Sequence, residues 1–129
     1  MSPTDDAHEI SQLLARIFHA GDSMDIEAWL ACHTDDAVFD SPDMHMVGLD
    51  ELRAGFHRLR GSSPLRHWIG NSVIDVEGDE ATAVSYLLVV TATFPPACVV
   101  SGVYRDRFRR VEGRWLVAQR LLTLDGRSS

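Results

Sequence analysis

The chain has 129 residues, 45% of them hydrophobic, a composition that fits one globular domain spanning residues 1–129. Its 12 basic residues are all arginines, and with 19 acidic residues they give a formal net charge of −7. This charge argues against nucleic acid and anionic membranes as partners, and the lack of lysine excludes Schiff-base catalysis and a P-loop phosphate site.

The N-terminal quarter of the chain carries the patterns of two helices. Thr4 or Asp5 can cap the first helix, and Gly21 is expected to end or loosen it. Asp25 is expected to cap a second, shorter helix. The first helix has one apolar stripe with the spacing i, i+3, i+4, i+7 and i+8, formed by Ile10, Leu13, Leu14, Ile17 and Phe18.

A short strand and a third helix precede a long stretch of extended patterns. Residues 37–39 predict the strand, and residues 48–59 predict a helix with apolar side chains on one face. Beyond Pro64, turn signals separate four extended runs, at residues 65–77, 80–94, 97–111 and 114–124. Helices followed by a four-stranded antiparallel meander predict an α+β fold, with three N-terminal helices on one face of a curved sheet.

Strand parity places polar side chains on the face that the helices cover, because alternate residues of a strand point to opposite faces. In the third run, Tyr104 and Asp106 share the apolar face, and three arginines share the other face. In the last run, the lone cation Arg120 shares a row with Leu116, Ala118, Leu122 and Leu124. A buried guanidinium needs a carboxylate partner, so Arg120 and Asp106 are expected to form a pair, which can be purely structural.

Three further polar residues are expected near that region. Parity in the first run puts His67 and Asn71 on a largely apolar face, and Asp22 follows Phe18 by four residues at the edge of the first helical stripe. Taken alone, His67 can be a hydrogen-bonded core residue and Asp22 can be a helix cap. Together, polar groups from separate segments converge on one apolar region, which is typical of a small-molecule site.

The chain contains, in this order, the segments HAGDSMDIEAWLACHTDDAVF, RHWIGNSVIDVEGDEATAVSY and GVYRDRFRRVEGRWLVAQR. These segments resemble the motifs of SnoaL-like domains, and the resemblance runs from about residue 8 to residue 122. It implies membership of the nuclear transport factor 2-like superfamily, whose cone-shaped, cystatin-like fold has three helices wrapped by a strongly curved antiparallel sheet. This fold agrees with the α+β arrangement predicted from the patterns.

The resemblance also implies a pair of catalytic residues. The catalytic aspartate and histidine of this family's dehydratases and dehydrochlorinase correspond to Asp22 and His67, and an arginine of the dehydrochlorinase corresponds to Arg120. An Asp–His pair suits proton abstraction next to a carbonyl and needs no organic cofactor or metal ion. Supporting or substrate-binding roles are expected for Tyr104, Asp106, Arg120, Asn71 and Tyr86.

The chain is therefore expected to be a cofactor-independent lyase or isomerase that acts on a hydrophobic, carbonyl-bearing small molecule of polyketide or steroid type. Gly21 stands where a dehydratase of this family has a tyrosine, which leaves the specific substrate open. The sequence also does not decide between dehydration, isomerisation and cyclisation. The alternative is a non-catalytic ligand-binding or oligomerisation module of the same fold. A third reading is an accessory subunit of a ring-hydroxylating dioxygenase.

The run of residues 86–90, Tyr-Leu-Leu-Val-Val, is apolar on both faces. This predicts that the outer face of the sheet meets another subunit, in a homodimer or a higher homo-oligomer. Cys32 and Cys98 form no CxxC pair and are expected to be reduced thiols of a cytoplasmic protein.

Overall fold

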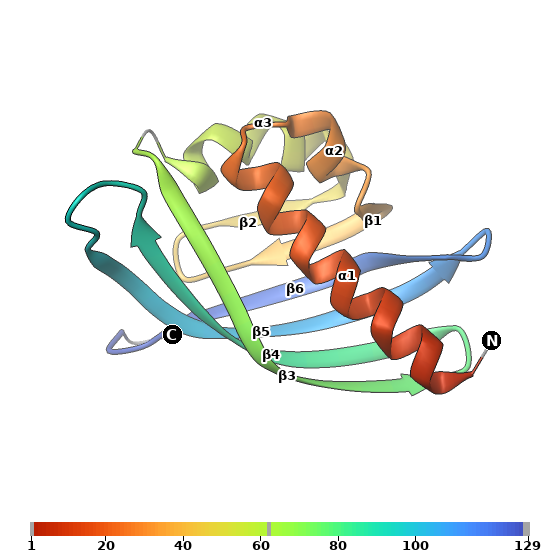
Figure 1. The fold of residues 1–129 in the computed structure, drawn as a ribbon. Coiled ribbons are helices and arrows are strands. Elements are labelled where there is room, and N and C mark those ends of the chain that lie inside the picture. The colour runs from red at the N-terminus through yellow and green to blue at the C-terminus, as the bar shows by residue number, and fades with distance from the viewer. Residues whose placement is uncertain (1, 62, 128–129) are drawn as a thin grey trace.

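Helices and strands follow each other along the chain in nearly the predicted order (Figure 1). The computed structural model describes residues 2–61 and 63–127. In these residues, three helices pack against one sheet: α1 (Pro3–Asp22), α2 (Ile26–Leu30) and α3 (Gly48–Arg60). The strands are β1 (His33–Asp40), β2 (His45–Val47), β3 (Leu65–Glu77), β4 (Glu80–Thr91), β5 (Cys98–Val111) and β6 (Arg114–Leu124). The expected α+β class is confirmed.

The sheet has six described strands in the order β2-β1-β6-β5-β4-β3. Neighbouring strands are antiparallel except β1 and β6, which are parallel. The predicted meander is correct for β3 to β6, but β1 extends well beyond residues 37–39, and β2 was not predicted. β1 begins with a polar stretch at 34–36 and shifts its register between His33 and Val38, so no apolar alternation marks its first half. β2 is too short to show a period.

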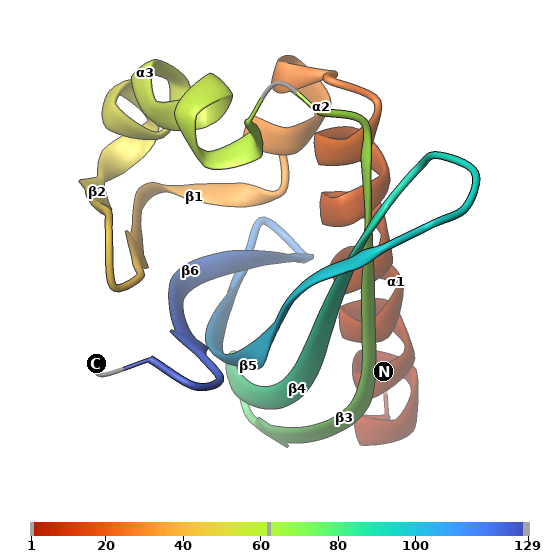
Figure 2. The same cartoon turned by 90° about the vertical axis from the view of Figure 1, so that its left-hand side faces the viewer.

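The long strands curl around a concave face (Figure 2). α1 lies along the β3 edge of the sheet, and α2 and α3 lie across the open end of the curl. Each antiparallel pair among β3 to β6 contains a register shift. Such bulges add one residue to one strand and bend it, so they produce the hollow in which a site can form.

A bulge in β3 corrects the prediction for Asn71. The β3–β4 pairing shifts between Gly70 and Val73, and Asn71 adopts a left-handed backbone with φ of 51°. Asn71 is exposed, and beyond it Ile74 and not Val73 turns toward the helices. The physical reason is that one extra residue in a strand reverses the alternation of every side chain that follows.

A second bulge corrects the predicted row around Arg120. The β5–β6 pairing skips Ala118, so Trp115 and Val117 are buried on the side of Arg120. Leu116 and Ala118, which parity placed in that row, are only partly buried. Arg120 itself is buried as predicted, because it lies beyond the bulge and keeps the parity of the strand end.

Helix α1 is longer than predicted at both ends. Ser2, not Thr4 or Asp5, is the N-cap, and it forms a capping box with Asp5. The helix continues through Gly21 and ends at Asp22. The predicted apolar stripe is buried in the core, at Ile10, Leu13, Leu14, Ile17 and Phe18.

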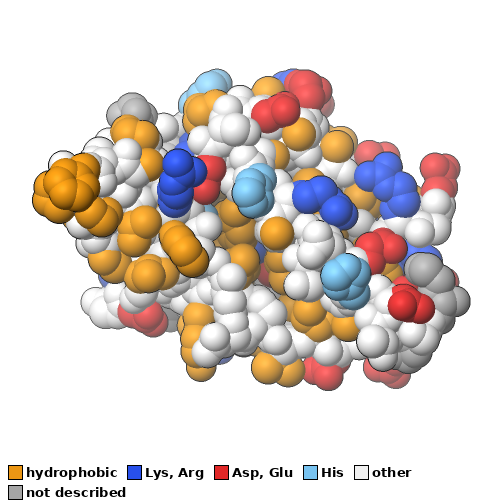
Figure 3. Space-filling view, in the orientation of Figure 1, with side chains coloured by type: hydrophobic (Ala, Val, Ile, Leu, Met, Phe, Trp, Pro, Cys, Tyr) orange, Lys and Arg blue, Asp and Glu red, His pale blue; other side chains and the backbone are white. Residues whose placement is uncertain are grey.

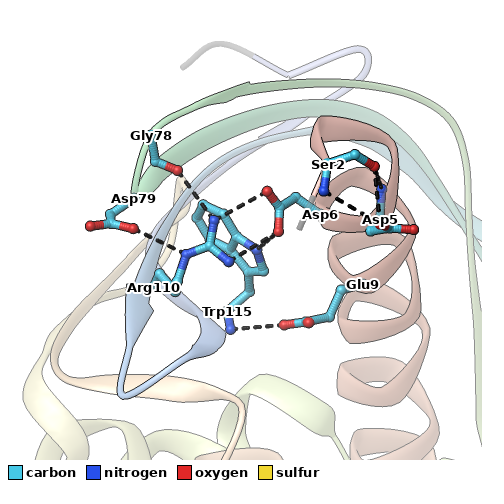
Figure 4. A network of polar contacts seen from close by, with 8 residues as sticks. All are labelled: Ser2, Asp5, Asp6, Glu9, Gly78, Asp79, Arg110 and Trp115. Carbon is cyan, nitrogen blue, oxygen red and sulfur yellow. Dashed lines mark hydrogen bonds and ion pairs between the residues drawn. The ribbon is translucent and has the colours of Figure 1, made fainter.

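A polar cluster fixes the first turns of α1 to the turn between β5 and β6 (Figure 4). Asp6 accepts hydrogen bonds from both Nη atoms of Arg110, at 3.0 and 3.1 Å, and from the indole of Trp115 at 3.1 Å. Glu9 accepts from the backbone N–H of Trp115 at 3.0 Å. Hydrogen bonds from Arg110 and Trp115 lower the pKa of Asp6. The start of α1 is therefore held in place on the sheet.

The two shorter helices close the opposite end of the curl. Asp25 caps α2 as predicted, because its carboxylate accepts the N–H of Ala28 at 3.1 Å. Leu52 and Phe56 bury the apolar face of α3, which ends one residue later than predicted, at Arg60. None of the helices in residues 2–61 and 63–127 has the length and apolar character needed to cross a bilayer.

Candidate active site

A cavity of about 400 Å³ opens on the concave face of the sheet, beside the C-terminal ends of α1 and α3. Most of its wall is apolar, with side chains from both helices and from β3 to β6. The polar side chains of the wall include Asp22, Arg60, His67, Tyr104 and Arg120. An apolar cavity of this size with a few convergent polar groups suits a small organic ligand.

Asp22 and His67, predicted to meet, lie in direct contact. The imidazole Nδ1 is 2.7 Å from Asp22 Oδ1, and the backbone N–H of His67 donates to Oδ2 at 3.0 Å. The last residue of α1 thus holds both the side chain and the backbone of one residue of β3. Because the carboxylate accepts a hydrogen bond from Nδ1–H, the neutral imidazole keeps its lone pair on Nε2. Nε2 is the atom that can act as a base.

The surroundings of His67 favour the neutral imidazole. Its ring stacks on Phe18, with centroids 5.4 Å apart, and its side chain is 14% exposed. Burial lowers the pKa of His67, Asp22 opposes that effect, and the cations Arg60 and Arg120 lower the pKa further. A histidine that is neutral at physiological pH can accept a proton there.

Arg120 and Asp106 form the buried ion pair that parity predicted. They face each other directly in the β5–β6 register, with Nε–Oδ1 at 2.8 Å and Nη2–Oδ2 at 3.2 Å. The guanidinium carbon lies 3.9 Å from the centroid of the Tyr104 ring. Burial raises the pKa of Tyr104, so its hydroxyl stays protonated and can donate a hydrogen bond. Asp106 lies behind Arg120 and supports it without lining the cavity.

Sequence reasoning missed Arg60, the last residue of α3. It is only 6% exposed, its Nε donates to the carbonyl of Gly21 at 2.5 Å, and its Nη2 lies 3.5 Å from Asp22 Oδ1. A signal was present in the sequence, because Arg60 follows the buried Leu52 and Phe56 at intervals of four residues. The side chain of Arg60 packs closely on Gly21, where an added Cβ would lie 3.4 Å from Arg60 Cδ.

Two residues expected at the site lie elsewhere. Asn71 is exposed at the β3 bulge. Tyr86 is 59% exposed on the outer face of the sheet, because its neighbour Leu87 is the residue of β4 that points inward. Neither residue lines the cavity, and the hydrogen-bond donors that do include Tyr104 and three arginines, two of which are buried.

The described residues contain no group of three or more His, Cys, Asp or Glu side chains placed to hold a metal ion. The aspartates and the histidine of residues 40–46, DSPDMHM, are therefore not a metal site in this structure, and His45 contacts Asp40 through Nδ1. What the site does contain is an oriented base, Nε2 of His67, together with hydrogen-bond donors around one apolar cavity. Such a set can remove a proton from carbon and stabilise the resulting anion.

The sequence of the chain matches a known protein family. The model of the SnoaL-like domain family matches residues 2–121. None of the curated proteins compared with the chain matches its sequence significantly.

Solved structures with the same fold resemble the chain over nearly its whole length. A Nostoc punctiforme PCC 73102 protein of unknown function with a cystatin-like fold is 30% identical, with a TM-score of 0.89, covering 98% of this chain and 95% of that one. A Mycobacterium tuberculosis protein of unknown function is also 30% identical, with a TM-score of 0.87 and coverage of 97% and 77%. An NTF2-like protein from Novosphingobium aromaticivorans is 26% identical, with a TM-score of 0.87 and coverage of 98% and 86%.

Proposed function

The chain belongs to the SnoaL-like domain family, and from this premise we propose that it is a cofactor-independent lyase or isomerase of the dehydratase or cyclase type. The proposed substrate is a hydrophobic small molecule that carries a carbonyl group. The observation that carries the proposal is the 2.7 Å contact between Asp22 and His67 at the wall of an apolar cavity.

The proposed first step is removal of a proton from the carbon next to the carbonyl. Nε2 of His67 takes the proton, the C–H electron pair forms a carbon–carbon double bond, and the carbonyl oxygen becomes an enolate oxygen. Asp22 stabilises the imidazolium that forms, and Tyr104 or Arg120 donates hydrogen bonds to the enolate. The imidazolium can then return the proton to a leaving hydroxyl, which departs as water, or to a second carbon, which completes an isomerisation.

A non-catalytic ligand carrier is the alternative with the same cavity. A carrier needs apolar walls, but it has no need of a carboxylate held against an imidazole that is stripped of most of its water. Burying that pair costs free energy that ligand binding alone does not require. The contact therefore favours the enzyme over the carrier.

The test is a comparison of Asp22→Asn and His67→Ala with the wild-type protein. Apolar β-hydroxyketones and β,γ-unsaturated ketones serve as a substrate panel, because loss of water and isomerisation both produce a conjugated enone with strong ultraviolet absorbance. His67→Ala removes the general base, and Asp22→Asn removes the charge that stabilises the imidazolium, so each variant is expected to lose about 100-fold or more of the rate. The wild-type rate is expected to fall as acid protonates His67, with the midpoint below the ordinary histidine pKa because burial lowers it.

Matched controls separate catalysis from folding. Asp35→Asn and His8→Ala make the same changes at exposed positions and should leave the rate intact. Circular dichroism and the melting temperature verify that all four variants fold. A wild-type rate in either Asp22→Asn or His67→Ala contradicts the proposal.

A further inference from the structure

The two guanidinium groups of the cavity differ in how completely the protein satisfies them. Arg120 on β6 makes a bidentate pair with Asp106, which lies directly opposite on β5. Arg60 has no carboxylate of its own. Its nearest one is Asp22, which already accepts hydrogen bonds from the side chain and the backbone N–H of His67.

Most of the hydrogen-bonding capacity of Arg60 is unused. A guanidinium has five N–H donors, and among the described residues only the Nε–H of Arg60 forms a hydrogen bond, to the carbonyl of Gly21. Nη2 is 3.5 Å from Asp22 Oδ1, at the outer limit of a hydrogen bond, and Nη1 has no partner among the described residues. Buried donors in proteins nearly always have a partner. A side chain that is 6% exposed and lacks these bonds therefore indicates a missing acceptor.

The free edge of Arg60 has the geometry of an oxyanion site. Because Nε is occupied by Gly21, the edge that remains is the one formed by Nη1 and Nη2. Two parallel N–H groups in one plane match the two oxygens of a carboxylate, which is why arginine recognises such groups better than a point charge does. This side chain lines the same cavity as His67.

The charge of the cavity wall also favours an anionic ligand. The wall carries three arginines, at positions 58, 60 and 120, and two aspartates, Asp22 and Asp43. Asp43 is already paired with both Nη atoms of Arg127, at 2.9 and 3.0 Å. The whole chain, in contrast, has 12 basic and 19 acidic residues. Arg120 is likewise paired with Asp106, so the wall groups without a full ionic partner among the described residues are Arg58 and Arg60 against Asp22. The cavity of an acidic protein therefore has a net excess of one positive charge where a ligand would lie.

We propose that the ligand of this cavity carries a carboxylate on its apolar body, and that Arg60 binds this group through its Nη1–Nη2 edge. The inference deepens the proposed function, on which it rests, by assigning a charged class of substrate. Binding at Arg60 places the anionic end of the substrate beside Asp22, which fixes the distance between that end and the carbon that faces His67.

The test compares two probes of nearly equal shape. 2-Naphthoate carries the carboxylate, and 2-naphthamide replaces it with a neutral group of similar size. Isothermal titration calorimetry of the wild-type protein is expected to give at least tenfold tighter binding of the naphthoate. In Arg60→Gln this preference should disappear, and in Arg60→Lys a reduced preference should remain because the charge is kept without the planar edge.

The control is Arg53→Gln, the same substitution on α3 at an exposed residue that pairs with Glu27 outside the cavity. It should keep the wild-type preference. The inference is overturned if the two probes bind equally to the wild-type protein, if Arg60→Gln keeps the preference, or if neither probe binds at millimolar concentration.

One further variant distinguishes this inference from the proposed function. His67→Ala removes the base but leaves Arg60 in place, so it should lose turnover and keep the preference for naphthoate. A wild-type protein that binds both probes equally, while its turnover depends on His67, contradicts only the role of Arg60. Turnover that survives in His67→Ala contradicts only the proposed reaction.

Discussion

His33 and His67 show how surroundings give two histidines of one chain different properties. His67 lies against the carboxylate of Asp22, in a cavity wall that a ligand can reach. His33 is buried beside Trp29, with Nδ1 2.8 Å from the Trp29 carbonyl and no partner for Nε2 among the described residues. Burial lowers the pKa of His33 to about 4, and the charge of Arg120 adds to the effect. His33 is thus a neutral part of the core over most of the pH range.

This buried histidine predicts a loss of stability in acid. The unfolded chain binds a proton on His33 below about pH 6.5, whereas the folded protein does so only below about pH 4, so the free energy of unfolding falls as the pH drops through this window. The contribution is about 3 kcal/mol, because one unit of pKa difference is worth about 1.4 kcal/mol. Urea unfolding at pH 7 and pH 4 measures it.

His33→Asn should flatten this pH dependence by roughly that amount, since an amide does not titrate. His8→Asn changes an exposed histidine and should keep the wild-type dependence. An unchanged slope in His33→Asn would show that the acid loss comes from other groups, among them His67, whose pKa burial also lowers.

At the residue scale, the sequence predicted the position of site residues where a regular apolar pattern surrounds them, and it failed at a helix end and at a strand bulge. Asp22 follows the apolar stripe of a regular helix, and His67 lies in a regular strand where the alternation of side chains holds. The family resemblance then suggested a catalytic role for both. Arg60 was missed because a charged residue at the end of a helix is usually solvated, and only its four-residue interval from Phe56 suggested burial. Asn71 was misplaced because a bulge has no fixed residue type.

At the element scale, the close approach of β5 and β6 near the cavity depends on Gly102. A Cβ built there would lie 2.3 Å from the backbone oxygen of Thr123 and 3.4 Å from Leu122 Cδ1. The backbone of β6 must therefore move if any side chain is added. Leu122 and Leu124, which line the cavity, belong to the same stretch of β6.

Gly102→Ala is predicted to lower the free energy of unfolding by about 1–3 kcal/mol, the usual cost of forcing extra atoms into a packed region. Gly70→Ala provides the matched control, because it lies in β3 with nothing within 4 Å of its added Cβ. Chemical denaturation compares the two. Equal stability of both variants would show that β5 and β6 separate without cost.

The elements themselves were predictable to different degrees. β3 to β6 are long and are separated by glycine and proline turns, so their limits follow from the sequence within about three residues. β1 and β2 depend on pairing with each other and, for β1, with the distant β6, and no local pattern carries that information. Long-range pairing, more than residue preference, decides these strands.

At the scale of the whole molecule, part of the outer face of the sheet, on β3 and β4, is apolar and exposed. Trp68 on β3 lies opposite Leu88 on β4, and they are 65% and 41% exposed. Tyr86 and Val84 extend this area along β4. The space-filling view also shows hydrophobic side chains around the projecting β4–β5 turn (Figure 3), where Phe94 is 97% exposed. A patch of this kind is typical of an interface.

We expect this face to form a homodimer or a higher homo-oligomer. Trp68→Glu places a charge in the middle of the patch and should shift the protein toward a monomer, as measured by size-exclusion chromatography with light scattering. Thr82→Glu adds the same charge at an exposed position nearer the other end of β4 and should leave the mass unchanged. A wild-type protein that is monomeric at every concentration contradicts the expectation.

The cluster of Asp6, Arg110 and Trp115 ties α1 to the sheet at one end of the molecule, while Asp22 and the cavity lie at the other. The polar cluster that holds the helix on the sheet and the candidate site therefore lie at opposite ends of a single helix. Mutations at the rim of the cavity leave the hydrogen bonds of this cluster, at the opposite end of α1, unchanged. Such a scaffold is well suited to evolve new substrate preferences, in nature or in the laboratory, without first having to regain its fold.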